Sequence, residues 1–207
     1  GGTAADAAVA VIFALSVTDY GAFCIGGEVP FLIYDVKRGK VEVLSGQGTA
    51  PKLGTLEYYQ GIGGIPRIGD PNNLKSAAVP AVIDLCVTAL MRYGTLTFTD
   101  TIQPVLRILD SGKEPWYPKL ARTLRRLIDA EKESPGGRLE GLQSVSDRFY
   151  RGDIAKELDV WYRKHDGLLR QEDLAEHKTF VEKPVKVDYR GYTIYKAGAW
   201  TQGPYLS

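Results

Sequence analysis

Residues 30–51, PFLIYDVKRGKVEVLSGQGTAP, carry the clearest secondary-structure signal in the chain. Two apolar runs, 31–34 and 41–44, flank a turn at 37–40, and this arrangement predicts a β-hairpin. The first arm is apolar at consecutive positions, which is typical of a strand that is covered on both faces. We therefore expect the hairpin to lie inside a sheet and not at its rim.

The loop after the hairpin places one long amide side chain between two glycines. These residues are Gly46, Gln47 and Gly48. Glycine breaks the strand and allows close backbone approach, so the loop is predicted to present Gln47 for contact with a ligand. An alternative remains open, in which Gln47 only caps the end of the strand, because loop residues beside glycines often serve turn geometry alone.

Composition and charge exclude several classes of protein. A chain of 207 residues is long enough for one sizeable core or two modest ones, and its apolar and charged fractions are ordinary for a globular protein. Because 26 basic residues nearly balance 25 acidic ones and no basic run is interleaved with aromatics, no nucleic-acid surface is predicted. The most apolar stretch, 7–17, is too short to span a bilayer, so no membrane partner is expected. The compartment stays open between cytoplasm and periplasm.

One helix is predicted before the first hairpin, and several are predicted after it. Thr3 is a suitable N-cap, and Asp6 three residues later complements the first turn of an alanine-rich helix. This helix lacks a polar face, so we expect it to be covered on most sides. Helical spacing of apolar residues recurs at 79–91, 99–109 and 120–130, and a second hairpin with a turn at Arg190 and Gly191 is predicted at 184–195.

The histidines and cysteines predict neither a metal nor a cofactor. Cys24 and Cys86 lie far apart in apolar settings, which indicates buried free thiols. His165 precedes a helix-ending glycine, where a cation complements the helix dipole. His177 is predicted on the polar side of a short helix, and the two histidines lack the spacing of zinc motifs. No serine, histidine and acid arrangement is indicated, so no catalytic residue is assigned within the chain.

A series of short motifs runs through nearly the whole sequence. It starts with GGTAADAAVAVIFALSVTD at 1–19, followed by IGG, FLIYD and a loop ending in AP. It continues with SAAVPAV at 76–82, RYGTL at 92–96, QP at 103–104, FYRGDIA at 149–155, DGLL at 166–169, EDLA at 172–175 and YRGYTIY at 189–195. The order of these motifs resembles the gamma-glutamyltransferase family of N-terminal-nucleophile hydrolases.

The resemblance implies an α+β chain that forms part of a four-layer αββα sandwich. Residues 1–207 are then a single domain fragment of the large subunit, incomplete without the downstream large-subunit and small-subunit residues. The family cuts its own precursor, and the new N-terminal threonine of the small subunit is the nucleophile, with its own amine as general base. The expected partner is therefore this small subunit, because Gly1 has no hydroxyl or thiol with which to attack.

The resemblance also predicts a role for Gln47 in substrate recognition. The corresponding residue in gamma-glutamyl transferases is typically an arginine, which binds the α-carboxylate of the glutamyl donor through two charge-assisted hydrogen bonds. Glutamine cannot replace that charge, and an unpaired buried carboxylate costs several kcal/mol, roughly. The chain is thus predicted to belong to an amide hydrolase or acylase whose small-molecule amide substrate is not gamma-glutamyl.

A second predicted substrate-binding segment lies near the end of the chain. Residues 198–204 occupy the place of a serine and glycine loop in the family, so Trp200 and Gln202 join Gly46, Gln47 and Gly48 as expected substrate contacts. A plain strand-to-helix connection explains residues 198–204 equally well.

Two other functions stay open. The protein is a gamma-glutamyl transferase or glutathione hydrolase if another cation, such as Arg67 in the glycine-bearing excursion 53–73, replaces the missing arginine. It is a binding or scaffold protein if the family nucleophile is absent from the downstream sequence. A threonine at the head of the small subunit separates the enzymes from the scaffold.

Overall fold

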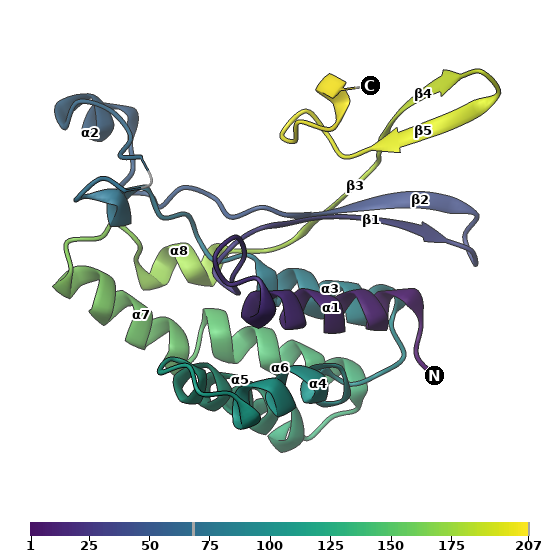
Figure 1. The fold of residues 1–207 in the computed structure, drawn as a ribbon, viewed down its shortest axis with the longest axis horizontal. Helices are drawn as coiled ribbons and strands as arrows, with labels where there is room; N and C mark the ends of the chain where they lie inside the picture. The colour runs from purple at the N-terminus through teal and green to yellow at the C-terminus, as the bar shows by residue number, and fades with distance from the viewer. Residues whose placement is uncertain (68, 207) are drawn as a thin grey trace.

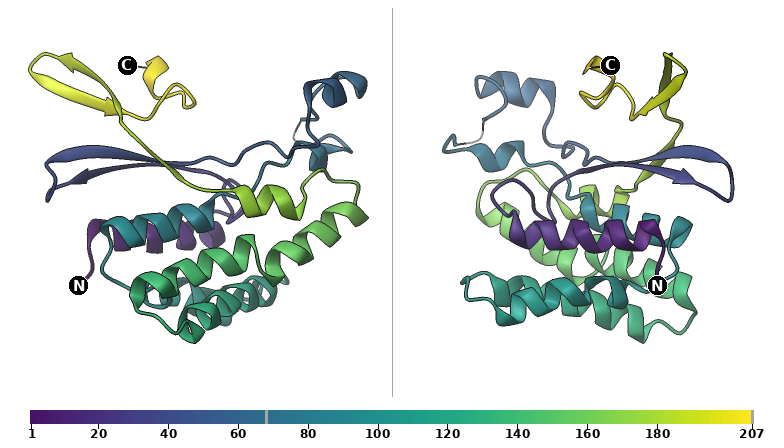
Figure 2. Two further views of the ribbon diagram at one scale, coloured as in Figure 1. Left: turned by 180° about the vertical axis from the view of Figure 1, so that it is seen from behind. Right: turned by 45° about the vertical axis from the view of Figure 1, so that its right-hand side comes forward.

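Helices gather on one side of a three-stranded antiparallel sheet (Figure 1). The computed structural model describes residues 1–67 and 69–206. The strand order is β1 (Val29–Asp35), β2 (Lys40–Gly46) and β3 (Phe180–Glu182), so the last strand joins the hairpin from far along the chain. A separate two-stranded hairpin, β4 (Val185–Tyr189) and β5 (Tyr192–Lys196), lies on the side of the sheet away from the helices (Figures 1 and 2).

The first hairpin forms where the sequence predicts it. The carboxylate of Asp35 accepts from the backbone N–H groups of Lys37 and Arg38, and Gly39 takes a φ of +63° that favours glycine. The prediction that this hairpin is interior is wrong for β1. In the described residues β1 is an edge strand, because only β2 pairs on both sides, and it buries Phe31 while Leu32 stays exposed.

Two helices pack directly beneath the sheet. They are α1 (Ala4–Thr18) and α3 (Val82–Tyr93), and Figure 2 shows both between the strands and the lower helices. The predicted capping box of α1 is present, since Thr3 and Asp6 exchange hydrogen bonds. Asp6 also accepts from the backbone N–H groups of Thr95 and Leu96. Burial opposes its ionisation, but these backbone hydrogen bonds outweigh it and lower the pKa of Asp6 to about 2.

The expectation that α1 is covered on most sides is wrong. Ala7, Val11 and Leu15 form a stripe at intervals of four residues along one face of the helix. Val11 is 55% exposed and Leu15 is 41% exposed. The opposite face is buried, and Phe13 meets Phe98 edge to face with ring centroids 5.5 Å apart. The described part of the chain therefore leaves an apolar stripe of α1 open.

The remaining helices form a second layer beneath α1 and α3, with a further group at one end of the molecule. The second layer consists of α4 (Phe98–Ser111), α5 (Tyr117–Glu133) and α6 (Arg138–Tyr150). The other elements are α2 (Leu56–Gly61), α7 (Asp153–Lys164), α8 (Gln171–Glu176) and two short 3₁₀ helices, Asn73–Ser76 and Pro204–Leu206. One continuous apolar cluster joins α1, α3, α4, α5, α6 and β2. The three helical stretches predicted from periodicity are thus confirmed.

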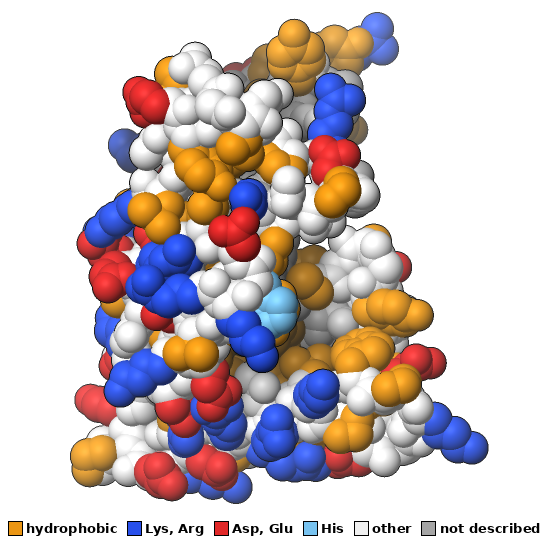
Figure 3. All heavy atoms as spheres, turned by 90° about the vertical axis from the view of Figure 1, so that its left-hand side faces the viewer, with side chains coloured by type: hydrophobic (Ala, Val, Ile, Leu, Met, Phe, Trp, Pro, Cys, Tyr) orange, Lys and Arg blue, Asp and Glu red, His pale blue; other side chains and the backbone are white. Residues whose placement is uncertain are grey.

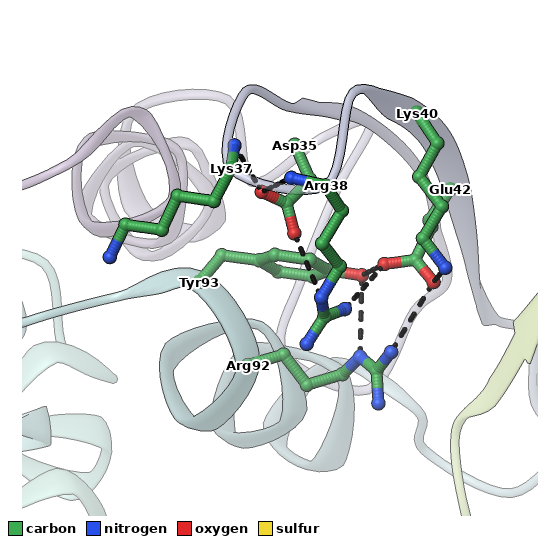
Figure 4. Close-up of polar contacts among 7 residues, drawn as sticks. All are labelled: Asp35, Lys37, Arg38, Lys40, Glu42, Arg92 and Tyr93. Carbon is green, nitrogen blue, oxygen red and sulfur yellow. Dashed lines mark hydrogen bonds and ion pairs between the residues drawn. The ribbon is translucent and has the colours of Figure 1, made fainter.

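Glu42 ties the hairpin to α3 (Figure 4). Its carboxylate pairs with Lys40 at 2.9 Å and Arg38 at 3.0 Å on the hairpin, and accepts from the hydroxyl of Tyr93 at 2.8 Å. Arg92 adds a longer contact at 3.4 Å. The bond from Lys40 is the largest cause that lowers the pKa of Glu42 to about 2, against the opposing effect of burial. This carboxylate therefore stays ionised and holds the sheet against α3.

The surface carries charges of both signs. Figure 3 shows lysine and arginine side chains among aspartate and glutamate over the lower part of one face, and hydrophobic side chains beside a hollow. None of the helices that the structure describes is long and apolar enough to cross a membrane.

Candidate functional site

The last residue of β2 and the loop that follows it pack so closely on their neighbours that two positions admit only glycine. A Cβ atom on Gly46 would lie 2.5 Å from the carbonyl oxygen of Val29. A Cβ atom on Gly48 would lie 1.8 Å from the carbonyl oxygen of Val79. Both distances are far below van der Waals contact, so the two glycines predicted at the site are required by backbone packing.

The same loop is anchored at two points on the C-terminal side of Gln47. The carbonyl of Thr49 accepts from the N–H of Val79 at 2.9 Å. The N–H of Lys52 donates to the carboxylate of Asp173 at 2.9 Å, and the Lys52 ammonium pairs with Glu176. Loop 46–52 is thus fixed to the segment before α3 and to α8. Such support holds a side chain in place for recognition.

Gln47 faces a carboxylate that the sequence analysis did not single out. The β1–β2 ladder ends at the pair of Val29 and Gly46, and Glu28 and Gln47 are the next residues of the two chain segments. The side-chain amide of Gln47 donates to the carboxylate of Glu28. Gln47 is half-buried and Glu28 is exposed. Glu28 could have been found from the sequence only by extending the register of the predicted hairpin beyond its strands.

The segment that supports the loop is held by Tyr150 of α6. Its hydroxyl donates to the carbonyl of Pro80 at 2.8 Å and accepts from the N–H of Asp84 at 3.2 Å, in the first turn of α3. The carboxylate of Asp84 accepts from Ser146 at 2.8 Å and from the N–H of Thr179 at 2.7 Å. A buried tyrosine therefore caps α3, and Asp84 connects α3 to the start of β3.

The two histidines differ from each other in setting. His165 is the C-cap of α7, as expected, and its Nδ1 donates to the carbonyl of Trp161 at 2.7 Å. The prediction for His177 is wrong, because its side chain is buried and stacks on Tyr150 with ring centroids 5.1 Å apart. Burial lowers the pKa of His177, so the ring is neutral at pH 7.

The two cysteines also differ. Cys86 is fully buried in α3, and burial raises the pKa of its thiol. Cys24 is exposed, so the expectation of a buried thiol is wrong there, because the loop before β1 runs over the surface. Among the residues that the structure describes, no group of three or more histidine, cysteine or acidic side chains is placed to hold a metal ion.

The second predicted segment lies apart from the first. The indole N–H of Trp200 donates to Glu182 at 2.9 Å, and Glu182 pairs with Val43 in the ladder. Gln47 lies four residues beyond Val43, about 13 Å along the strand. Gln202 is exposed. Within this structure Trp200 and Gln202 therefore do not lie beside Gln47.

Arg67 does not pair with the side chains around Gln47 in the described part of the chain. Its backbone N–H donates to the carboxylate of Asp70 at 2.7 Å, in the irregular excursion that precedes α3. It makes no hydrogen bond or ion pair with Gln47 or Glu28 among the residues that the structure describes. The charged side chain that contacts Gln47 is the carboxylate of Glu28.

The arrangement of these elements matches solved structures of one class of enzyme. A structure of LmbA2991T421A aligns with 100% of this chain and 43% of that chain, with 29% identity and a TM-score of 0.87. Gamma-glutamyltranspeptidase from Pseudomonas nitroreducens, solved in complex with L-DON, aligns with 98% of this chain and 66% of that chain, with 25% identity and a TM-score of 0.74. The fold is the α+β fold of the N-terminal-nucleophile hydrolases, as expected.

The family follows from a match over the whole chain. Residues 1–130 and 107–207 match the family model described as gamma-glutamyltranspeptidase. The chain belongs to this family, and it corresponds to the large-subunit portion. The family resemblance seen in the order of the sequence motifs is thereby confirmed.

Curated relatives include both hydrolases of glutathione and an acylase. The chain is 26% identical to the glutathione hydrolase proenzyme of Escherichia coli (strain K12), over 94% of this chain and 38% of that protein. It is 29% identical to the Acylase ACY 1 proenzyme of Pseudomonas sp. (strain SE83), over 94% of this chain and 40% of that protein. The chain thus spans about two fifths of the length of these relatives.

Proposed function

We propose that this chain is the large-subunit part of an amide hydrolase or acylase of the gamma-glutamyltransferase type, with a substrate that is not gamma-glutamyl. The observation that carries the proposal is the pair formed by Gln47 and Glu28. A neutral amide bonded to a carboxylate stands where the family resemblance leads us to expect a guanidinium. The acylase among the curated relatives is consistent with this reading.

The electrostatic argument concerns the α-carboxylate of a glutamyl donor. Two like charges about 4 Å apart repel by about 1 kcal/mol in water and about 4 kcal/mol near a protein surface. Arginine at position 47 would instead attract the same carboxylate through two hydrogen bonds. Glu28 repels the α-carboxylate and attracts the α-ammonium of a gamma-glutamyl group, so an acyl group without the α-carboxylate is favoured over gamma-glutamyl beside this loop.

The proposed reaction uses a nucleophile outside this chain. The N-terminal threonine of a small subunit attacks the amide carbon, its hydroxyl proton passes to its own α-amine, and the amine of the substrate leaves with a proton. Water then hydrolyses the resulting ester and releases the acid. The large subunit contributes the loop that contacts the acyl group, and the small subunit from the same precursor is the proposed partner.

The experiment compares two anilide substrates with the complete, processed protein. We expect butyryl-4-nitroanilide to be hydrolysed with a higher kcat/KM than gamma-glutamyl-4-nitroanilide, and Gln47→Arg to narrow this difference. Efficient turnover of the gamma-glutamyl compound, unaffected by Gln47→Arg, would instead favour a glutathione hydrolase. A complete protein that neither cleaves itself nor hydrolyses either anilide would favour a scaffold.

A further inference from the structure

We propose that Glu28 selects substrates whose acyl group carries a protonated amine and no carboxylate. This inference rests on the proposed amide hydrolase and names the class of acyl group that its loop accepts. The carboxylate of Glu28 would bind the ammonium group of such an acyl chain, while Gln47 orients the carboxylate through its amide N–H.

The position of Glu28 is fixed by backbone contacts. On its C-terminal side, Val29 begins the ladder and pairs with Gly46. On its N-terminal side, the N–H of Gly27 donates to the carbonyl of Cys24 at 2.9 Å, and the carbonyl of Gly27 accepts from Ala81 at 3.3 Å. The Glu28 backbone is thus held between the sheet and the segment before α3, as a recognition residue requires.

The charge of Glu28 is not compensated in the described part of the chain. Its carboxylate takes part in no ion pair there, and Gln47, its hydrogen-bond partner, is neutral. Glu42 shows the opposite situation, because Arg38, Lys40 and Arg92 surround it. Glu42 has a structural explanation in the contact between the hairpin and α3, whereas the exposed carboxylate of Glu28 has no cationic partner among the described residues and is accessible to a ligand.

The surroundings of Glu28 suit an ammonium group. Glu28 lines a hollow of about 480 Å³ together with the aromatic residues Tyr20 and Phe23 and with Pro30. This volume is within the range of small-molecule sites, which is about 300 to 1,000 Å³. Aromatic faces attract cations, and a carboxylate beside them supplies the opposite charge. None of the described residues that line the hollow is a lysine, an arginine or a histidine, so the lining offers no cation to a carboxylate-bearing acyl group.

The test uses four 4-nitroanilides that differ only in the charge at the end of the acyl chain. With the complete, processed protein, kcat/KM is measured for the butyryl, 4-aminobutyryl, glutaryl and gamma-glutamyl compounds. We expect kcat/KM for the 4-aminobutyryl compound to exceed that for the butyryl compound by about two- to fivefold, the range for one charge pair at an exposed site. The glutaryl compound should be the poorest.

Substitutions assign the preference to Glu28. Glu28→Gln should reduce the ratio of kcat/KM for 4-aminobutyryl over butyryl to about one. Glu114→Gln, the same change at an exposed site between α4 and α5, should leave that ratio unchanged. The double variant with Glu28→Gln and Gln47→Arg should prefer the glutaryl compound to the 4-aminobutyryl compound. It removes the carboxylate at position 28 and adds a guanidinium at position 47, so the charge next to the end of the β1–β2 ladder changes from negative to positive.

The outcomes separate this inference from the proposed function. If the processed protein hydrolyses anilides but prefers glutaryl over 4-aminobutyryl, or if Glu28→Gln leaves the ratio unchanged, the selection by Glu28 is wrong and the amide hydrolase stands. If no anilide is hydrolysed, the proposed function fails and the selection with it. The wild-type comparison alone decides the matter if Glu28→Gln does not fold.

Discussion

Gly48 leaves no room for a side chain against Val79, and this predicts a large effect from the smallest possible substitution. In the complete protein, Gly48→Ala should lower the free energy of unfolding by about 1 to 3 kcal/mol, because the loop must move away from a backbone carbonyl that cannot yield. Urea unfolding measures this loss. Gly21→Ala is the matched control, since no atom lies within 4 Å of its added Cβ. Equal stability of the two variants would contradict the packing argument.

Asp6 predicts a pH dependence of stability. Its pKa is about 2 in the folded chain and 3.8 ordinarily, so its contribution is present above pH 3.8 and is lost as the pH falls towards 2. The difference corresponds to about 2 kcal/mol. Asp6→Asn should therefore unfold at lower urea concentration at pH 7, and the gap to wild type should shrink between pH 4 and pH 2.5. A gap that is independent of pH would show that the charge of Asp6 is not the cause.

At the scale of single residues, the sequence pointed to Gln47 as a substrate contact but did not point to Glu28. Two glycines beside one amide are visible in the sequence, whereas Glu28 comes to the site only through pairing across the hairpin. His177 was misplaced for a related reason, since the stacking of Tyr150 from α6 on its ring is a tertiary contact. The assignment of Gly46, Gln47, Gly48, Trp200 and Gln202 to substrate contacts stays a prediction.

Among the secondary-structure elements, α3 depends on a hydroxyl from α6. Tyr150→Phe removes the group that bonds both Pro80 and Asp84, so a carbonyl and an N–H lose a buried partner. We expect a loss of about 1 to 3 kcal/mol in the free energy of unfolding. Tyr189→Phe on the exposed hairpin β4–β5 is the control and should change little. No difference between the variants would mean that water replaces the hydroxyl.

Glu42 gives a second prediction at this scale, for the contact between the hairpin and α3. Glu42→Gln removes the counter-charge of Lys40 and Arg92, whereas Arg38 keeps its ion pair with Asp35 (Figure 4). Thermal unfolding of the complete protein should show a loss of about 1.5 to 3 kcal/mol in the free energy of unfolding, because the hydrogen bonds of a buried charged group are weakened. Glu114→Gln should be neutral. A loss in both would point to a general effect of charge.

Periodicity predicted the elements well and their surroundings poorly. Apolar spacing and turn residues gave both hairpins and the helices α3, α4 and α5 within a few residues. The edge position of β1 and the open stripe on α1 were not predicted. An apolar residue looks the same in a sequence whether this chain or another segment covers it, so burial on both faces was assumed for Leu32 and Val11.

For the whole molecule, the exposed apolar surface predicts a difference between this segment and the complete protein. Val11, Leu32, Val187 and Tyr192 are each at least 41% exposed in the described chain. We expect amide hydrogens of β4 and β5 to exchange rapidly in a polypeptide of residues 1–207, because a lone two-stranded hairpin is marginally stable. They should exchange much more slowly in the complete protein. Similar rates would mean that the remainder leaves these strands uncovered.

The fold as a whole was predictable only through the family. Composition left the fold class open, and the order of motifs along the chain supplied it, because many weak matches in one order are improbable by chance. The expectation of one incomplete domain stays a prediction. The substrate depends on a few side chains at the end of one hairpin, which the overall architecture does not determine.

The hairpin register has an evolutionary consequence. Positions 28 and 47 are 19 residues apart in the chain, yet their side chains are hydrogen-bonded, so we expect a mutation at one to change the effect of a mutation at the other. Relatives that carry arginine at the second position should lack the acid at the first, and the two exchanges should occur together. Ancestral reconstruction along such a lineage would reveal whether the pair changed in concert.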